Sequence, residues 1–176
     1  MLGLLPGILI SGASESLGVV FAVWLEGSFA LALTGLGVAM GIIGAAELLG
    51  EGGVVVLSDR LGKRRTIALG IGLSTLAYLV LPAVGSSLTG SLIALFLVYF
   101  AFEFAIVANL PMITELMPDA RPSVMSANIA GQSLGRMLGA LLGGVLLPLG
   151  IGVSGIAAAG INLVALVVLL WWVREN

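Results

Sequence analysis

Six long apolar segments constrain this chain more than any other feature of its sequence. They cover residues 2–25, 33–57, 66–84, 90–113, 123–147 and 151–173. About 20 helical residues cross a hydrocarbon core ~30 Å thick, so each segment is long enough to span a membrane. An open sheet would leave backbone groups unpaired in lipid, and the segments lack the alternating pattern of a membrane barrel. The sequence therefore predicts an all-α membrane protein, with residues 1–176 forming one domain of six transmembrane helices.

The composition agrees with lipid as the surrounding solvent. Hydrophobic residues make up 60% of the chain and charged residues only 9%, whereas a soluble domain carries roughly 25% charged residues. A soluble fold of this length would have to expose much of this apolar surface to water. The 26 glycines are also typical of membrane helices, where glycine lets backbones approach closely.

The basic residues indicate how the bundle is oriented. When the connections are assigned alternately to two sides, six of the seven Lys and Arg residues fall on the side that carries both termini. They are Arg60, Lys63, Arg64, Arg65, Arg121 and Arg174. An excess of cations marks the cytoplasmic side of a membrane protein. We therefore expect a multi-pass protein of the cell (plasma or inner) membrane with both termini cytoplasmic.

The string LSDRLGKRR at residues 57–65 follows the second predicted helix. It resembles the signature loop of the major facilitator superfamily, whose pattern is roughly G-x-L-A-D-R-x-G-R/K-R/K-R. The matching residues are Leu57, Asp59, Arg60, Gly62, Lys63, Arg64 and Arg65. Ser58 replaces Ala, and Val55 replaces the leading Gly. The resemblance implies that Asp59 through Arg65 form a latch that favours one access state of a transporter. The alternative is a basic loop that only fixes topology.

A row of glycines marks the fifth predicted span. Gly131, Gly135, Gly139 and Gly143 follow one another at four-residue spacing. With Gly144, the row resembles the g-x-x-x-G-P-x-x-G-G pattern in the fifth helix of antiporters of the same superfamily. Ala140 replaces the proline, so we do not infer antiport. The alternative is a seam of small residues that packs against a neighbouring helix.

The resemblance also implies the architecture and the partners. Members of the superfamily usually have twelve helices in two six-helix halves, and this chain has room for one half. The two halves of such transporters share an orientation in the membrane. We therefore expect either a parallel homodimer or a second six-helix half that this chain lacks. A lipid bilayer and a small-molecule substrate are the other expected partners, and we expect no nucleic acid, cofactor or metal.

Four ionisable residues lie near the middle of predicted spans, namely Glu15, Glu47, Glu103 and Arg136. Each costs about 2.5–3.5 kcal/mol on insertion scales, so such residues persist when they pair or line a water-filled cavity. Substrates and coupling ions of secondary transporters bind at this depth. Glu47 and Glu51 share a helix face because they are four residues apart. Nearby carboxylates repel each other, so at least one of this pair can hold a proton, as a proton carrier must. The alternative for Glu51 is that it lies near the cytoplasmic end of its span and reaches water.

Polar residues on the fifth span form a stripe beside the glycine row. Asn128, Gln132 and Arg136 are four residues apart and therefore share a face, which we expect to line a cavity of the substrate or proton pathway together with Glu15, Glu47 and Glu103. Arg136 either binds an anionic substrate or pairs with Glu103, and both interpretations remain open. We expect Asn109, on the preceding span, to form a hydrogen bond between helices rather than to bind a ligand, and we expect the same of Asn162.

The function that these features favour is secondary active, proton-coupled transport of a small organic solute. The alternative is a non-transporting membrane assembly or scaffold protein derived from a transporter half. We do not expect an enzyme, because the chain contains no His and no Cys, which excludes Ser–His, Cys–His and HExxH chemistry.

Overall fold

The computed structural model describes residues 2–116 and 118–172. Arg174 and the predicted end of the sixth span at residue 173 lie outside these residues. Within them the fold is all-helical and contains six helical segments long and apolar enough to cross a membrane, as predicted. The α-helices are α1 (Leu5–Gly18), α2 (Phe21–Phe29), α3 (Leu33–Leu61), α4 (Lys63–Val84), α5 (Leu88–Leu116), α6 (Arg121–Leu146) and α7 (Ile151–Trp172). Short 3-10 turns cover Leu2–Leu4, Pro118–Ala120 and Leu147–Leu149.

The first span differs from its prediction, because it is broken and longer than expected. α1 ends at Gly18, and α2 begins at Phe21 and continues to Phe29, beyond the predicted end at residue 25. The break tightens to a 3-10 turn in which the Val20 N–H donates to the Leu17 carbonyl at 3.0 Å. Two consecutive β-branched valines occupy the break, and β-branched side chains are crowded in a helix.

The signature motif is not a loop, which corrects the prediction. α3 continues through Asp59 and Arg60 to Leu61, and α4 begins at Lys63. Gly62 alone connects the two helices, with φ 82°. L-residues with a side chain rarely adopt this conformation, so the glycine permits the sharp turn. Arg60 lies in the last turn of α3, where the helix dipole favours a cation. Lys63, Arg64 and Arg65 form the first turn of α4, where the dipole does not favour them, so their helical conformation has another cause.

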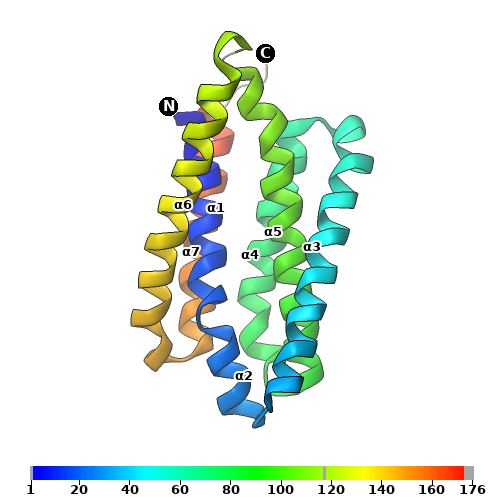
Figure 1. Cartoon of the computed structure of the whole chain (residues 1–176), viewed down its shortest axis with the longest axis vertical. Coiled ribbons are helices and arrows are strands. Elements are labelled where there is room, and N and C mark those ends of the chain that lie inside the picture. Colours follow the sequence, from blue (N-terminus) through cyan, green and yellow to red (C-terminus); the bar gives the residue numbers. More distant parts are fainter. Residues whose placement is uncertain (1, 117, 173–176) are drawn as a thin grey trace.

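The helices form a bundle of two three-helix groups (Figure 1). One group contains α1, α6 and α7, and the other contains α3, α4 and α5. α1 packs on α6 and α7, α5 packs on α3 and α4, and the contact of α4 with α7 joins the groups. We call the end that carries the α3–α4 and α5–α6 connections, at the top of Figure 1, the basic end.

The helix contacts show an internal symmetry that was not readable from the sequence. The first span consists of α1 and α2 together, and the second and third spans are α3 and α4. The last three spans are α5, α6 and α7. Exchanging the two sets converts the α1–α6 contact into the α5–α3 contact, and the α1–α7 contact into the α5–α4 contact. Because α1 and α5 run in opposite directions, this is the pattern of an inverted repeat.

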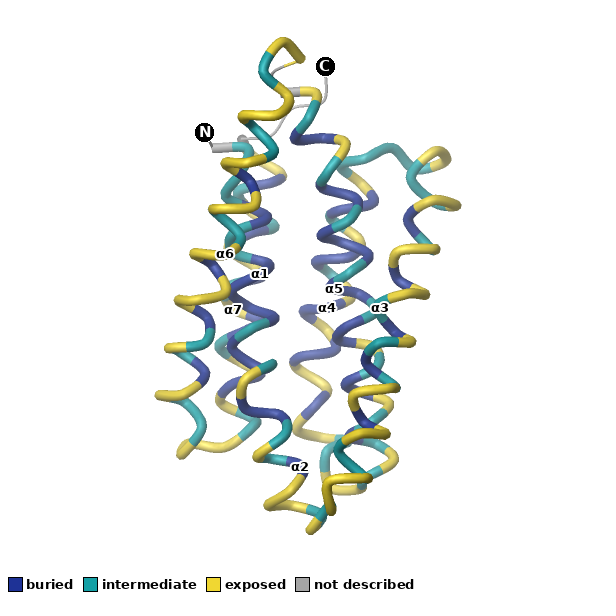
Figure 2. The backbone as a smooth tube through the Cα atoms, in the orientation of Figure 1, coloured by how far each residue is buried: buried dark blue, intermediate teal, exposed yellow. Residues whose placement is uncertain are grey.

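Burial differs sharply among the six spans. The first span and α5 are the most buried, whereas α3 and α6 are the least buried (Figure 2). Asn162 is one of the buried polar residues of the interior, and its Nδ2 donates to Ser74 Oγ at 2.7 Å between α7 and α4. This contact matches the interhelical hydrogen bond expected of Asn162. Asn109 makes no such bond among the described residues, so the same expectation was wrong there.

Candidate functional site

A cavity of about 360 Å³ lies among α1, α3, α5 and α6 and contains all four mid-span ionisable residues. We call it the polar cavity. Each charged residue of the lining comes from a different helix: Glu15 from α1, Glu47 from α3, Glu103 from α5 and Arg136 from α6. The structure therefore brings together four side chains that the sequence analysis placed at similar depths and assigned to one substrate or proton pathway.

Hydroxyl groups complete the polar part of the lining. Ser11 and Ser14 enter from α1, and Tyr99 enters from α5. Glu15 and Tyr99 approach each other across Gly18, where an added Cβ atom would lie 3.8 Å from Glu15 Oε1 and 3.2 Å from the Tyr99 hydroxyl. Sequence reasoning missed Tyr99, although a signal was available. It precedes Glu103 by one helical turn and so faces the same side of α5.

The charges in the polar cavity act on one another without forming a close ion pair. Glu103 lies within electrostatic reach of Glu47, Glu51 and Arg136. A pairing of Arg136 with Glu103, one of the two interpretations that the sequence left open, is not formed, because the ion pair within 4.0 Å among the described residues is Lys63–Glu115. Three carboxylates and one guanidinium therefore share the lining of the cavity. Glu51 is exposed and lies outside the cavity lining.

Close packing of α6 against α1 fixes the position of Arg136. A Cβ atom on Gly135 would lie 2.2 Å from the Ile8 carbonyl oxygen, and one on Gly139 would lie 2.2 Å from the Gly12 carbonyl oxygen. No side chain fits at such distances, so the two backbones touch directly. Gly143 meets the α1 backbone in the same way, while Gly131 meets only the Ile8 side chain. The glycine face thus anchors α6, and the adjacent face presents Arg136 to the cavity.

The remaining members of the polar stripe do not line the polar cavity. Asn128 is fully buried, and Gln132 is partly buried. Both lie on the part of α6 between Arg136 and the basic end, beside Asn109 of α5.

Comparison with known proteins gives the family. The family model described as Major Facilitator Superfamily matches residues 4–176. The chain belongs to the major facilitator superfamily. The superfamily consists of membrane transporters, not enzymes, and a six-helix half of such a transporter agrees with the fold. No curated protein matches the chain significantly.

The signature residues of this superfamily member tie helices together at the basic end. Lys63 donates to Glu115 near the end of α5, and Arg64 Nη2 donates to the Leu170 carbonyl of α7. Asp59, by contrast, is exposed and has no hydrogen bond or ion pair among the described residues. Capping of α4 by Asp59 is not observed, since α4 has no side-chain cap. The motif therefore bonds α4 to α5 and α7.

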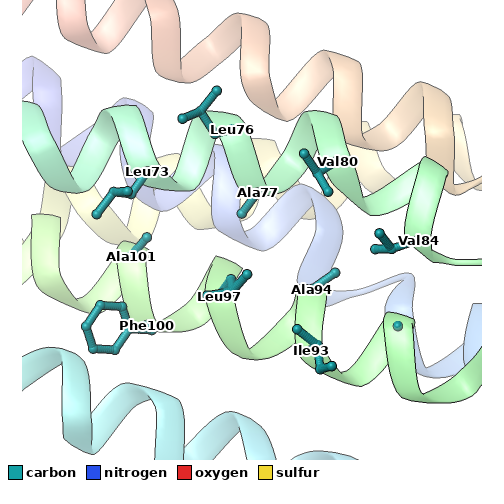
Figure 3. Close-up of a pocket in the computed structure, with 11 residues that line it drawn as sticks. Leu73, Leu76, Ala77, Val80, Val84, Ile93, Ala94, Leu97, Phe100 and Ala101 are labelled. Atoms are coloured by element: carbon teal, nitrogen blue, oxygen red, sulfur yellow. The ribbon is translucent and has the colours of Figure 1, made fainter.

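A second recess on the protein is larger than the polar cavity, but no charged or hydrogen-bonding side chain lines it. It has a volume of about 430 Å³ and lies between α4 and α5, lined by apolar side chains such as Leu76, Val80 and Leu97 (Figure 3). We call it the apolar recess. These three side chains are exposed on the surface of the bundle, where lipid is the natural neighbour. The polar cavity is therefore the candidate site.

Proposed function

We propose that the chain carries out secondary active, proton-coupled transport of a small organic solute across the cell membrane. The observation that carries this proposal is the convergence of Glu15, Glu47, Glu103 and Arg136 on one cavity at mid-membrane depth. Ionisable groups at this depth are costly and mark substrate or proton pathways. Secondary transporters bind their substrates and coupling ions near the bilayer midplane.

The excess of carboxylates over cations suits proton coupling. If all three carboxylates were ionised, Arg136 would neutralise only one of them. Glu47 and Glu103 line the same cavity, and like charges at low dielectric favour the protonated form of one partner. In this proposal, Glu47 and Glu103 exchange the coupling proton, and Arg136 binds an anionic group of the solute.

The orientation is part of the proposal. The basic end carries the cations of the α3–α4 and α5–α6 connections, so the positive-inside rule assigns it to the cytoplasm. The signature residues Asp59, Arg60, Gly62, Lys63, Arg64 and Arg65 lie at the cytoplasmic end, where they act as the latch of the transport cycle.

A second six-helix unit is needed to complete the pathway. Arg136 is exposed and Glu47 is only half-buried on the surface of this unit. Arg136 belongs to α6 and Glu47 belongs to α3, and these are the two least buried helices. Contact of these charges with hydrocarbon would cost about 2.5–3.5 kcal/mol each on insertion scales. We infer that a parallel second copy, or another six-helix half, covers them. Cross-linking that finds a stable, transport-competent monomer would contradict this arrangement.

Transport in membrane vesicles tests the function. Vesicles carrying the chain are given a mixture of isotope-labelled organic acids, amino acids, amines and sugars, and mass spectrometry follows uptake and efflux under a pH gradient. We expect Glu47→Gln and Arg136→Ala to reduce the flux by at least about tenfold, equal to about 1.4 kcal/mol, with insertion intact. Glu26→Gln, which changes an exposed carboxylate of α2 outside the cavity, is the matched control. Normal transport by both cavity variants would overturn the proposal.

A further inference from the structure

Three side-chain amides converge on α1 between the polar cavity and the basic end. The position that a Cβ atom would occupy on Gly7 lies 2.9 Å from Asn109 Nδ2, 3.4 Å from Asn128 Oδ1 and 3.6 Å from Gln132 Nε2. Asn109 belongs to α5, and the other two belong to α6. Three helices therefore meet here through polar groups, and the missing side chain of Gly7 provides the space. We call Asn109, Asn128 and Gln132 the amide cluster.

The amide cluster is buried, yet its polar atoms have no protein partner. Asn109 and Asn128 are both 0% exposed, and none of their side-chain nitrogen and oxygen atoms forms a hydrogen bond with a described residue. The same holds for Gln132 Nε2. Asn162 differs in its donor group, because it is also buried but its Nδ2 donates to Ser74 Oγ, while its Oδ1 has no partner among the described residues. Buried amides are almost always satisfied by protein or by ordered water, so the amide cluster requires a ligand that can donate and accept hydrogen bonds.

Polar groups connect the amide cluster to the polar cavity. On α1, Ser11 follows Gly7 by one helical turn, lines the cavity and has an unpartnered Oγ atom. On α6, Arg136 also lines the cavity and follows Gln132 by one turn. One turn is about 5.4 Å, a separation that a water molecule with several polar partners can bridge.

We propose that the amide cluster binds buried water molecules that extend the polar cavity toward the basic end. Asn128 lies seven residues after the start of α6, so the cluster is about 10 Å inside the basic end. The next residues of α5 toward that end include Met112 and Ile113, which are buried and apolar. Water therefore enters from the cavity, and the extension stops at this apolar layer.

The extension gives protons a hydrogen-bonded path from the cavity carboxylates toward the basic end. This role rests on the proposed proton-coupled transport, whereas the hydration of the cluster does not. Water access is therefore measured without any solute or pH gradient, so that a failure of transport and a failure of hydration remain distinguishable.

Silver-ion labelling of single cysteines measures this water access. The chain contains no cysteine, so Asn128→Cys and Asn109→Cys each introduce one thiol. Ag⁺ is a small hydrophilic probe that reacts with the thiolate, which forms where water reaches the thiol. The full chain in membrane vesicles is exposed to Ag⁺ and denatured. The thiols that remain are then alkylated with N-ethylmaleimide and counted by intact mass spectrometry. Asn162→Cys is the matched control, because Asn162 is also a buried asparagine, its Nδ2 has a protein partner, and it lies apart from the other amides on α7.

We expect Ag⁺ to react at positions 109 and 128 at least about tenfold faster than at position 162, since thiol reactivity follows access to water. Two cluster positions are used so that a folding defect in one variant does not decide the result. Equally slow reaction at all three positions would overturn the proposal. Equally fast reaction at all three would also overturn it, because water would then penetrate the bundle without regard to the amide cluster.

Discussion

The two faces of α5 border two cavities of similar size and opposite chemistry. One face presents Tyr99 and Glu103 to the polar cavity of about 360 Å³. The other presents Ile93 and Leu97 to the apolar recess of about 430 Å³. The larger space carries no charged or hydrogen-bonding side chain, and it opens where lipid is expected. Volume therefore does not identify the site in a membrane protein, whereas the convergence of costly charges does.

The largest expected effect comes from the close contact of α6 with α1, which positions Arg136 in the polar cavity. Gly139→Ala places a Cβ atom 2.2 Å from the Gly12 carbonyl oxygen, so α6 must move away from α1. We expect a loss of about 3 kcal/mol in the free energy of unfolding, the upper part of the range for overpacking. Thermal unfolding in detergent micelles measures it.

Gly144→Ala on the same helix is the control for this change. An added Cβ atom there meets nothing within 4 Å. The substitution should be neutral or should stabilise the helix by about 0.5–1 kcal/mol. Equal destabilisation by the two variants would show that the α1–α6 contact is not as close as described.

The next effect tests the comparison itself on a single helix. Glu103→Gln changes the polar face of α5, and Leu97→Ala changes the apolar face. Solute flux in vesicles should fall by at least about tenfold in the first variant, because its carboxyl group can no longer exchange a proton. The flux of the second variant should match the unaltered chain. Equal transport by the two variants would show that the polar and apolar faces of α5 do not differ in function.

A smaller effect is expected at the interhelical hydrogen bond between α7 and α4. Asn162→Ala removes the donor to Ser74 Oγ and should cost about 0.6 kcal/mol of stability, the average for such bonds in membranes, and no more than about 1.7 kcal/mol, the largest value measured. A double-mutant cycle with Ser74→Ala isolates the pair. A coupling free energy of zero would mean that the bond contributes nothing.

The smallest effect is expected in the apolar recess. Leu97 is 48% exposed, and lipid replaces its contacts when it is shortened. Leu97→Ala should therefore change the free energy of unfolding by less than about 0.5 kcal/mol. A loss comparable with that of Gly139→Ala would indicate that a protein partner, not lipid, occupies the recess.

Hydropathy and length predicted the six helical spans, because lipid leaves a chain few other options. They did not predict the break at Val19 and Val20, which interrupts a continuous apolar run. They also placed a loop where Gly62 alone connects α3 and α4. Helix ends depend on backbone geometry, and a charged string is compatible with helix as well as with loop.

The positions of Glu15, Glu47, Glu103 and Arg136 within their predicted spans indicated that these residues lie at the same depth in the membrane and favoured one pathway, but did not establish that they share a cavity. That result needs the lateral order of the helices, which one sequence does not contain. The same limit explains Asn109. Its residue type suggested an interhelical hydrogen bond, yet its neighbours in space are two further amides and a glycine.

Neutral replacement of all four cavity charges in one protein is the most direct test of the account. The variant carries Glu15→Gln, Glu47→Gln, Glu103→Gln and Arg136→Gln. We predict that its pH-gradient-driven solute flux falls to the level of empty vesicles, while the protein still inserts and is at least as stable, because charges at membrane depth have been removed. A scaffold or assembly protein would tolerate all four changes, so unchanged flux in this variant would contradict the account.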